Sequence, residues 1–386
     1  TIRESSNALE QFKLSSTLYL KLKNLSMIAD INVRIGLTYI DTGKYDKAMV
    51  HFKKSIEIYE KEKNILEAAN AYGCIGNIYM FQGKFDKAHE IFTKQYEVNK
   101  KLDSKQSIIV SLGNLALIDN IHGKFTSSIN RFNEILITAE DINDSMSICK
   151  TYGNIGLSHK NLGEYDEALN NYKKQLKMSE KSGYKGQHSS CLINLGLVFH
   201  KKGQFKKSLK HYNDAEEIVK ETDDINGQSL VYGNRASLFI DQGKLDNALK
   251  EFSKANQIFK KLDNLRLMAL ADMNIAKIYS LKKDYKTSDI TLSKTYQYFK
   301  KINDLPNYSE SLIIKSEIAR NLNNFKVAEN SIDEAIKVAK ELNSDTLSNT
   351  AVIEKYIIYF FLSGINFIGL TKPEGVTSHL VASNSL

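Results

Sequence analysis

The sequence predicts an all-α protein, a right-handed α-solenoid superhelix of about eight tandem helix-turn-helix repeats. The first observation is a glycine that recurs at a fixed step of 40 residues. The second is a set of small and large apolar positions that keeps the same step without insertion. The third is that proline, which breaks helix interiors, occurs only twice in 386 residues. Such self-similarity defines an array in which each unit packs on its neighbours.

The recurring glycine marks the end of the first helix of each unit, which we call the A helix. Glycine tolerates the left-handed backbone conformation that commonly ends a helix. In the first complete unit the A helix is expected at about residues 26–41. Lys283 and Asn323 replace the glycine in the last two units. The glycines are Gly43, Gly83, Gly123, Gly163, Gly203 and Gly243.

A second amphipathic helix, the B helix, follows each of these turns. Its stripe begins with a mostly aromatic position, at Tyr45, Phe85, Phe125, Tyr165, Phe205, Leu245, Tyr285 and Phe325. Three residues on comes a small residue, at Ala48, Ala88, Ser128, Ala168, Ser208, Ala248, Ser288 and Ala328. Four further on comes a large one, at Phe52, Phe92, Phe132, Tyr172, Tyr212, Phe252, Leu292 and Ile332. This i, i+3, i+7 spacing is typical of one helix face, and the short turn predicts an antiparallel helix pair.

The A helix carries its own small position, at Gly36, Gly76, Ala116, Gly156, Gly196, Ala236 and Ala276. Together these positions give the pattern NxGxxxxxxGxYxxAxxxY, which runs from Asn154 to Tyr172 in one unit. The pattern resembles the tetratricopeptide repeat (TPR). The period of 40 rather than about 34 residues implies longer helices and is similar to LGN/Pins-type and kinesin-light-chain-type repeats. The resemblance covers about residues 1–345 and implies a protein-binding solenoid.

The array is expected to extend over residues 1–362. Complete repeats occupy about 26–342, and a capping helix is expected at about 345–362. Residues 1–22 form a partial repeat, because Ala8 and Phe12 fall 40 residues before Ala48 and Phe52. We therefore expect the chain to be an excerpt of a longer protein. The alternative is that these residues form an N-terminal capping helix. Residues 363–386 have no helical stripe and predict an irregular C-terminal tail.

Composition narrows the possible partners. The net charge of +8 is diluted over the chain and mildly favours acidic partners. No Arg-rich helix or aromatic stacking platform indicates nucleic acid. The apolar stretch 356–370 is interrupted by polar residues and is shorter than the about 20 residues of a membrane span. Three widely separated cysteines without a CxxC pair favour a reducing compartment, and we expect a cytoplasmic protein.

Catalytic motifs are missing from the sequence. No GxxxxGK[ST], GxGxxG, HExxH or GxSxG pattern occurs. The eight histidines are scattered without the spacing of metal ligands. We therefore expect no enzyme, no cofactor and no metal site.

Candidate binding residues lie two positions before the small residue of each A helix, where the stacked repeats would form a concave groove. Arg34 and Cys74 occupy this position first, and five asparagines follow: Asn114, Asn154, Asn194, Asn234 and Asn274. A carboxamide offers two donors and an acceptor, so it can hold the peptide groups of a partner. The resemblance implies that these asparagines contact an extended peptide. The alternative is that they hydrogen-bond between neighbouring repeats.

Two further sets of residues are expected on the same face. One helical turn beyond the asparagines lie Asn77, Leu117, Leu157 and Leu197, of which the leucines predict an apolar floor unless adjacent helices cover them. Lysines at the centre of the array favour a carboxylate-bearing, acidic peptide, although a lysine cluster can also be a solvated face. They are Lys150, Lys160 and Lys201.

Glycine precedes the asparagine position in four units, at Gly73, Gly113, Gly153 and Gly233. A glycine inside a helix costs about 0.5–1 kcal/mol relative to alanine. Close approach by a neighbouring helix or by a ligand would explain it. In TPR domains that bind chaperone tails, a clamp lysine stands at this position, so the resemblance does not extend to those ligands.

These features predict a protein–protein interaction module that binds an extended peptide or partner segment in its groove. One alternative is a sensory or regulatory region of a larger signalling protein, such as a kinase or a transcriptional regulator. Another is a structural or oligomerisation scaffold, with self-association through the C-terminal tail.

Overall fold

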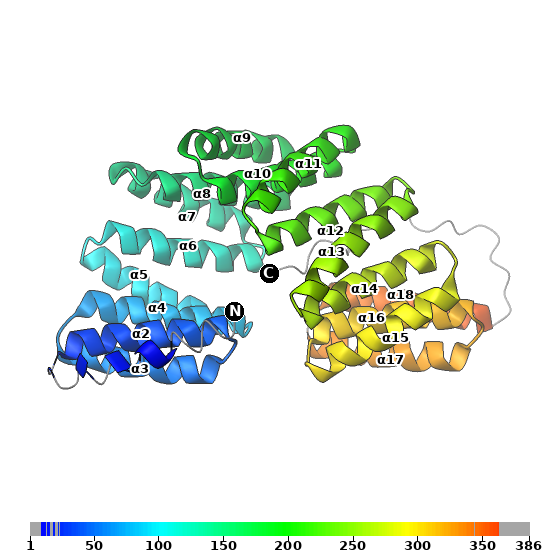
Figure 1. Cartoon of the computed structure of the whole chain (residues 1–386), viewed down its shortest axis with the longest axis horizontal. Coiled ribbons are helices and arrows are strands. Elements are labelled where there is room, and N and C mark those ends of the chain that lie inside the picture. The colour runs from blue at the N-terminus through cyan, green and yellow to red at the C-terminus, as the bar shows by residue number, and fades with distance from the viewer. Residues whose placement is uncertain are drawn as a thin grey trace. The chain divides into compact units, whose positions relative to one another are not determined.

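The computed structural model describes residues 9–12, 14–15, 18–19, 22, 24–342 and 344–362. Over these ranges it contains helices and no strand, which confirms the predicted all-α repeat array (Figure 1). The A helices are α2 (Leu25–Asp41), α4 (Ile65–Phe81), α6 (Lys105–Ile121), α8 (Ser145–Leu162), α10 (Lys185–Lys201), α12 (Ile225–Asp241), α14 (Leu265–Leu281), α16 (Leu305–Asn321) and α18 (Asp345–Leu362). The B helices are α3 (Tyr45–Lys61), α5 (Phe85–Lys101), α7 (Phe125–Asp141), α9 (Tyr165–Ser182), α11 (Phe205–Glu221), α13 (Leu245–Lys261), α15 (Tyr285–Lys301) and α17 (Phe325–Glu341).

Most A helices begin at a side chain that caps their first turn. Asn64 Oδ1 accepts a hydrogen bond from the backbone N–H of Glu67 at 3.3 Å, and Asp144 Oδ1 accepts one from Ser147 at 3.0 Å. Such caps satisfy backbone donors that the first turn of a helix leaves without a partner. The repeat of Asn or Asp at this step therefore fixes where each new helix pair starts.

The repeated small and large residues of the B helices form the core. All eight small residues, from Ala48 to Ala328, have an exposed fraction of 0%. Where the small residue is serine, its hydroxyl donates to a backbone carbonyl of the paired A helix. Ser208 Oγ, for example, lies 2.7 Å from the carbonyl oxygen of Gly196. The buried hydroxyl thus has its partner, which explains why serine and alanine alternate at this position.

The turn between the A and B helices has the same left-handed backbone conformation in every repeat. The six predicted glycines have φ between +68° and +80°. Lys283 and Asn323, which replace the glycine, adopt φ of +63° and +59°. The 40-residue register therefore imposes this conformation even on residues that have a Cβ atom.

We expect Lys283→Gly to raise the free energy of unfolding by about 1 kcal/mol, because a residue with a Cβ atom is strained at positive φ. Lys283 is exposed, so little packing is lost. Gly243→Ala is the matched control: φ is +69° there, no atom lies within 4 Å of an added Cβ, and stability should fall. Urea unfolding followed by far-UV circular dichroism measures both. A less stable Lys283→Gly protein would contradict the assignment of strain.

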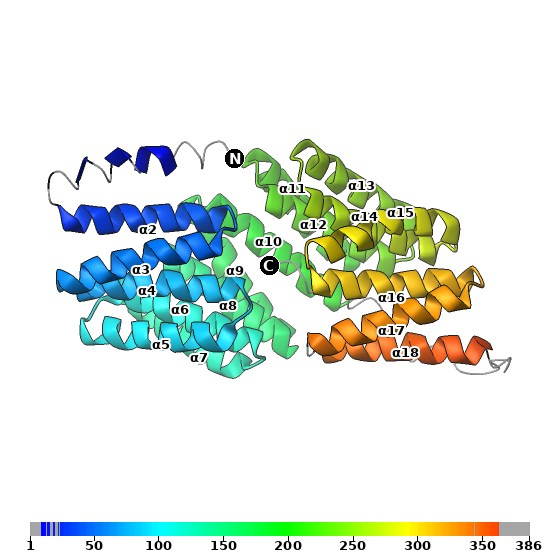
Figure 2. The same ribbon diagram turned by 90° about the horizontal axis from the view of Figure 1, so that it is seen from below.

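The chain divides into two compact units, residues 1–187 (unit 1) and residues 188–386 (unit 2). Within unit 2, α16, α17 and α18 pack on one another, as Figure 2 shows. None of the helices in the described ranges is long and apolar enough to cross a membrane. The predicted tail, residues 363–386, lies outside the described residues, as does most of the predicted partial repeat at residues 1–22.

Candidate binding site

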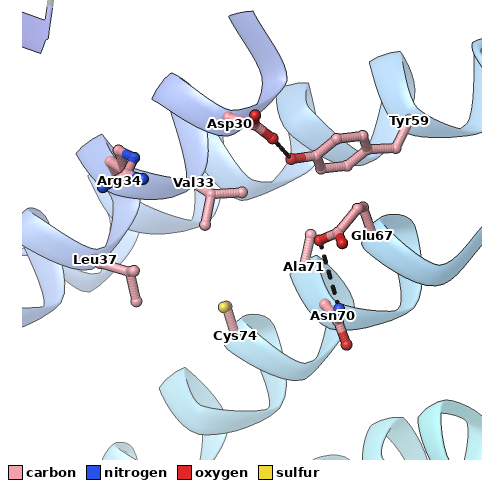
Figure 3. Close-up of a pocket in the computed structure, with 9 residues that line it drawn as sticks. All are labelled: Asp30, Val33, Arg34, Leu37, Tyr59, Glu67, Asn70, Ala71 and Cys74. Carbon is pink, nitrogen blue, oxygen red and sulfur yellow. Dashed lines mark hydrogen bonds between the residues drawn. The ribbon is translucent and has the colours of Figure 1, made fainter. Parts of the chain in front are cut away.

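Unit 1 contains a cavity between two successive A helices. It has a volume of about 330 Å³ and opens between α2 and α4 (Figure 3). One residue of the B helix α3, Tyr59, closes its end. The lining residues are Asp30, Val33, Arg34, Leu37, Tyr59, Glu67, Asn70, Ala71 and Cys74.

The repeat register explains why these residues meet. Arg34 and Cys74 stand 40 residues apart, at the position that asparagine occupies in the next five repeats. Asp30 and Asn70 precede them by four residues, which is about one helical turn, so they lie on the same helix face. The predicted binding position two residues before the small residue of each A helix, which we call the ladder position, therefore faces a cavity in the first two repeats.

The polar residues of the cavity are held by hydrogen bonds. The Tyr59 hydroxyl donates a short hydrogen bond to Asp30 Oδ1, and Asn70 Nδ2 donates to Glu67 Oε2 at 3.5 Å (Figure 3). Burial, together with the hydrogen bond to the Asp30 carboxylate, raises the pKa of Tyr59. The phenol thus remains a hydrogen-bond donor at neutral pH and orients Asp30.

The cavity also has apolar lining residues. Val33 and Leu37 of α2 and Ala71 of α4 line it together with the thiol of Cys74. Burial raises the pKa of Cys74 to about 11, so the thiol is uncharged at neutral pH. Cys149 and Cys191 both have an exposed fraction of 0%. Cys74 is therefore the one partly accessible cysteine of the three.

In the rest of unit 1, the predicted residues lie on α4, α6 and α8. Asn114 and Asn154 are half-buried, and neither carboxamide makes a hydrogen bond to another residue in the part of the chain that the structure describes. The alternative reading, hydrogen bonding between neighbouring repeats, is thus not seen for these two asparagines. Asn77 and Leu157 are half-buried, and Leu117 is exposed.

The two predicted lysines of unit 1 lie on α8. Lys150 is exposed and Lys160 is half-buried. Lys150 stands at the same repeat position as Asp30 and Asn70, which line the cavity. This repeat position therefore carries a carboxyl group on α2, an amide group on α4 and a cation on α8.

In unit 2, the predicted asparagines have three different environments. Asn194 is half-buried and Asn234 is buried. Asn274 Nδ2 donates to the carbonyl oxygen of Leu270 at 2.9 Å, within its own helix. Leu197 is half-buried and Lys201 is exposed.

Two of the four mid-helix glycines make room for a neighbouring side chain. A Cβ atom on Gly73 or Gly153 would lie 2.6 Å from the buried amide of Gln95 or Gln175, respectively. Both glutamines belong to the B helix that follows. At Gly113 the nearest atom would be 3.9 Å away, and at Gly233 nothing lies within 4 Å. Close approach by a neighbouring helix or by a ligand was predicted to explain these glycines. Approach by a neighbouring helix is confirmed at Gly73 and Gly153.

Of the nine residues that line the cavity, only Arg34 and Cys74 stand at a position predicted for binding. The other seven were not predicted, among them Tyr59, Glu67 and Asn70. The sequence contained a signal for Asn70, because it falls 40 residues after Asp30 and 80 before Lys150. Glu67 stands in the first turn of α4, where an acidic residue is ordinary. Tyr59 comes from a different helix, so no spacing within α2 or α4 indicates it.

Family models match parts of the chain. A tetratricopeptide repeat model matches residues 147–221, and a model of the soluble NSF attachment protein matches residues 2–103. A model of anaphase-promoting complex subunit 5 matches residues 77–151 and 276–360. A comparison with curated protein sequences finds no match.

Solved structures resemble the chain over most of its length at low sequence identity. The apo form of the quorum sensor NprR from B. thuringiensis is 15% identical with a TM-score of 0.61, covering 87% of this chain and 99% of that one. The Rap conjugation gene regulator of plasmid pLS20, in complex with the Phr* peptide, is 14% identical with a TM-score of 0.56, covering 95% and 99%. Aspartyl phosphate phosphatase F from Bacillus subtilis is 15% identical with a TM-score of 0.55, covering 72% and 73%.

The matched repeat model, the structural likenesses and the helix pairs at a 40-residue step agree with the sequence pattern. Residues 147–221 therefore contain repeats of the tetratricopeptide type, and the helix pairs before and after them keep the same 40-residue step.

Proposed function

We propose that the chain is a protein-interaction module that binds an extended peptide segment on the A helices of unit 1, without catalysing a reaction. The observation that carries this proposal is the cavity between α2 and α4, which is lined by the ladder residues Arg34 and Cys74. Asn114 and Asn154 occupy the same repeat position on α6 and α8. A ligand that follows this position would therefore leave the cavity and meet both amides.

The chemistry of the two asparagines suits a peptide backbone. Each carboxamide can donate to a carbonyl and accept from an N–H of an extended segment. Because neither is engaged by other described residues, no internal hydrogen bond has to be broken on binding. The exposed Leu117 adds an apolar contact next to Asn114. Amides select a peptide backbone rather than a particular side chain, so specificity must come from elsewhere on the face.

The solved structures support this proposal. The pLS20 regulator, which has a similar fold, was solved with a bound peptide. The same likeness favours a second candidate function, a sensory or regulatory region, because two of the similar structures are described as a quorum sensor and a gene regulator. Hydrogen exchange would test this second candidate: a peptide that regulates should change exchange in helices that it does not touch.

The double variant Asn114→Ala/Asn154→Ala tests peptide binding. We expect it to weaken the affinity for a peptide selected from a random display library by about tenfold or more, because up to four hydrogen bonds of about 0.5–1.5 kcal/mol each are lost. Fluorescence anisotropy of the labelled peptide measures the affinity, and circular dichroism should show unchanged helix content.

Asn130→Ala/Asn133→Ala is the matched control, because both asparagines are exposed on the B helix α7. This control should bind like the unmodified protein. Unchanged affinity in the Asn114→Ala/Asn154→Ala protein would show that the ladder is not the binding surface.

A further inference from the structure

We propose that the cavity between α2 and α4 is a specificity pocket for a basic side chain, lysine or arginine, of the bound segment. The aliphatic stem of this side chain would lie against Val33, Leu37 and Cys74, and its cation would face Asp30 and Glu67. The inference rests on the proposed function, in which a peptide segment follows the A helices. It adds the chemical class of the residue that the first two repeats select.

The cavity is large enough to admit one long side chain. Its volume of about 330 Å³ stands at the small end of the range for ligand pockets. Lysine and arginine combine an apolar stem with a charged head, so they bury the stem on apolar surface while the head meets polar groups. In Figure 3, Leu37 and Cys74 lie at one end of the cavity, together with Arg34, and Asp30, Tyr59 and Glu67 lie at the other.

The charge of the lining favours a cation. Asp30 and Glu67 contribute two carboxylates against one guanidinium, that of Arg34. Arg34 is exposed and stands across the cavity from Glu67 in Figure 3. Among the described residues, no carboxylate forms a salt bridge with Arg34, so its charge is not already neutralised. The positive charge of Arg34 therefore repels the cation that the pocket would bind. Removing this charge should strengthen the binding of a cation, whereas removing Asp30 or Glu67 should weaken it.

The carboxylates keep acceptor capacity for a ligand. A carboxylate has about four lone-pair sites. Tyr59 occupies one site on Asp30, and Asn70 makes a single long contact of 3.5 Å to Glu67. No lysine or arginine forms a salt bridge with either carboxylate within the described part of the chain. An incoming ammonium or guanidinium group would thus complete the hydrogen bonding of the pocket.

Disulfide exchange at Cys74 tests the preference of the pocket directly. The Cys74 thiolate attacks one sulfur of a small disulfide, which forms a mixed disulfide and releases the other half as a thiol. The protein is equilibrated at mildly alkaline pH with equal amounts of cystamine and bis(2-hydroxyethyl) disulfide. Intact-mass spectrometry then gives the ratio of cationic to neutral adduct, which is divided by the ratio for N-acetylcysteine amide. Cys74→Ser should remove both adducts.

We expect the normalised ratio to exceed one by about two- to fivefold, the size of an ion pair that is partly open to water. Asp30→Asn and Glu67→Gln should each lower it towards one, because they remove charge while preserving the hydrogen bonds to Tyr59 and Asn70. Arg34→Gln should raise it. A loosened structure would lower the ratio in every variant, so the opposite response of Arg34→Gln separates charge selection from misfolding.

Two outcomes would overturn the proposal. One is a normalised ratio of one or below in the unmodified protein. The other is a preference for the anionic disulfide 3,3′-dithiodipropionate, which would assign the pocket to a carboxylate held by Arg34. Either outcome leaves the effect of Asn114→Ala/Asn154→Ala on peptide affinity intact, so failure of the pocket and failure of the peptide-binding function are told apart.

Discussion

Replacing Arg235 by leucine is expected to lower the free energy of unfolding of unit 2 by about 3–5 kcal/mol, because it removes one partner from a buried network of charges. The Arg235 guanidinium is buried in α12. Its Nε donates to Glu251 Oε2 at 2.7 Å, and its Nη1 donates to Glu216 Oε2 at 2.6 Å and to Asn213 Oδ1 at 2.8 Å. The variant would leave both carboxylates without this donor.

Two lysines reduce the expected loss of stability in Arg235→Leu, but they do not replace the arginine. Lys220 Nζ lies 2.6 Å from Glu216, and Lys254 Nζ lies 3.0 Å from Glu251. Both lysine side chains are more than half exposed, whereas that of Glu251 has an exposed fraction of only 7%. The expected destabilisation therefore falls near the lower end of the range. Thermal unfolding followed by circular dichroism, together with hydrogen exchange in α12, measures it.

The neighbouring repeats provide the control. The position of Arg235 holds the buried residues Ile155 and Leu195 in the two preceding repeats. The positions of Glu216 and Glu251 hold Leu176 and Ile91 in earlier repeats. The triple variant Arg235→Leu/Glu216→Leu/Glu251→Ile places at each position an apolar residue that another repeat carries there, and it should recover most of the lost stability. If the single variant changed stability by less than about 1 kcal/mol, the network would be irrelevant to folding.

The network also predicts a dependence on pH. Burial alone would raise the pKa of Glu216, but hydrogen bonds from Arg235 and Lys220 outweigh it and hold the pKa at about 2. The unfolded value is about 4.3. Its contribution to stability is therefore complete above about pH 4.3 and is lost as the pH falls towards about 2. Unfolding midpoints measured across this window should fall less in the triple variant than in the unmodified protein.

The sequence predicted the helices and turns correctly because each is encoded by a residue type within its own repeat. Positive φ at Gly163, for example, and burial of Ala168 need only local spacing. Arg235 was not predicted to be buried, because an arginine inside a helix is ordinarily exposed. Its burial depends on Glu216 and Glu251, which belong to two different helices and are recognisable only once those helices pack.

The candidate site was predictable only in part. The ladder position could be read from the 40-residue step, and in the first two repeats it does face a cavity. The sign of the charge in the cavity could not be predicted from the 40-residue step. The net charge of +8 predicted an acidic partner, whereas Asp30 and Glu67 give the cavity two carboxylates. The net charge of the whole chain does not determine the charge of a pocket that is lined by residues from three helices.

Gly196→Ala is expected to lower the free energy of unfolding by about 1–3 kcal/mol, although alanine normally strengthens a helix. An added Cβ atom would clash with the ring of Tyr212, which has an exposed fraction of 0%. The ring belongs to the B helix of the same pair and is enclosed by the core, so it cannot rotate away. The pair would have to separate, and separation would also lengthen the hydrogen bond from Ser208 to the Gly196 carbonyl oxygen.

Three repeats carry alanine at this position, and in two of them it packs beside a buried phenylalanine, at Ala116 with Phe132 and Ala236 with Phe252. The third carries leucine instead of an aromatic ring: Ala276 and Leu292 are both buried, and Ser288 still donates to the Ala276 carbonyl oxygen at 2.6 Å. Gly196→Ala/Tyr212→Leu should therefore be more stable than the sum of the two single changes by about 1–3 kcal/mol. A thermal-unfolding double-mutant cycle measures this coupling. Strictly additive effects would mean that the glycine is not kept by the ring that packs on it.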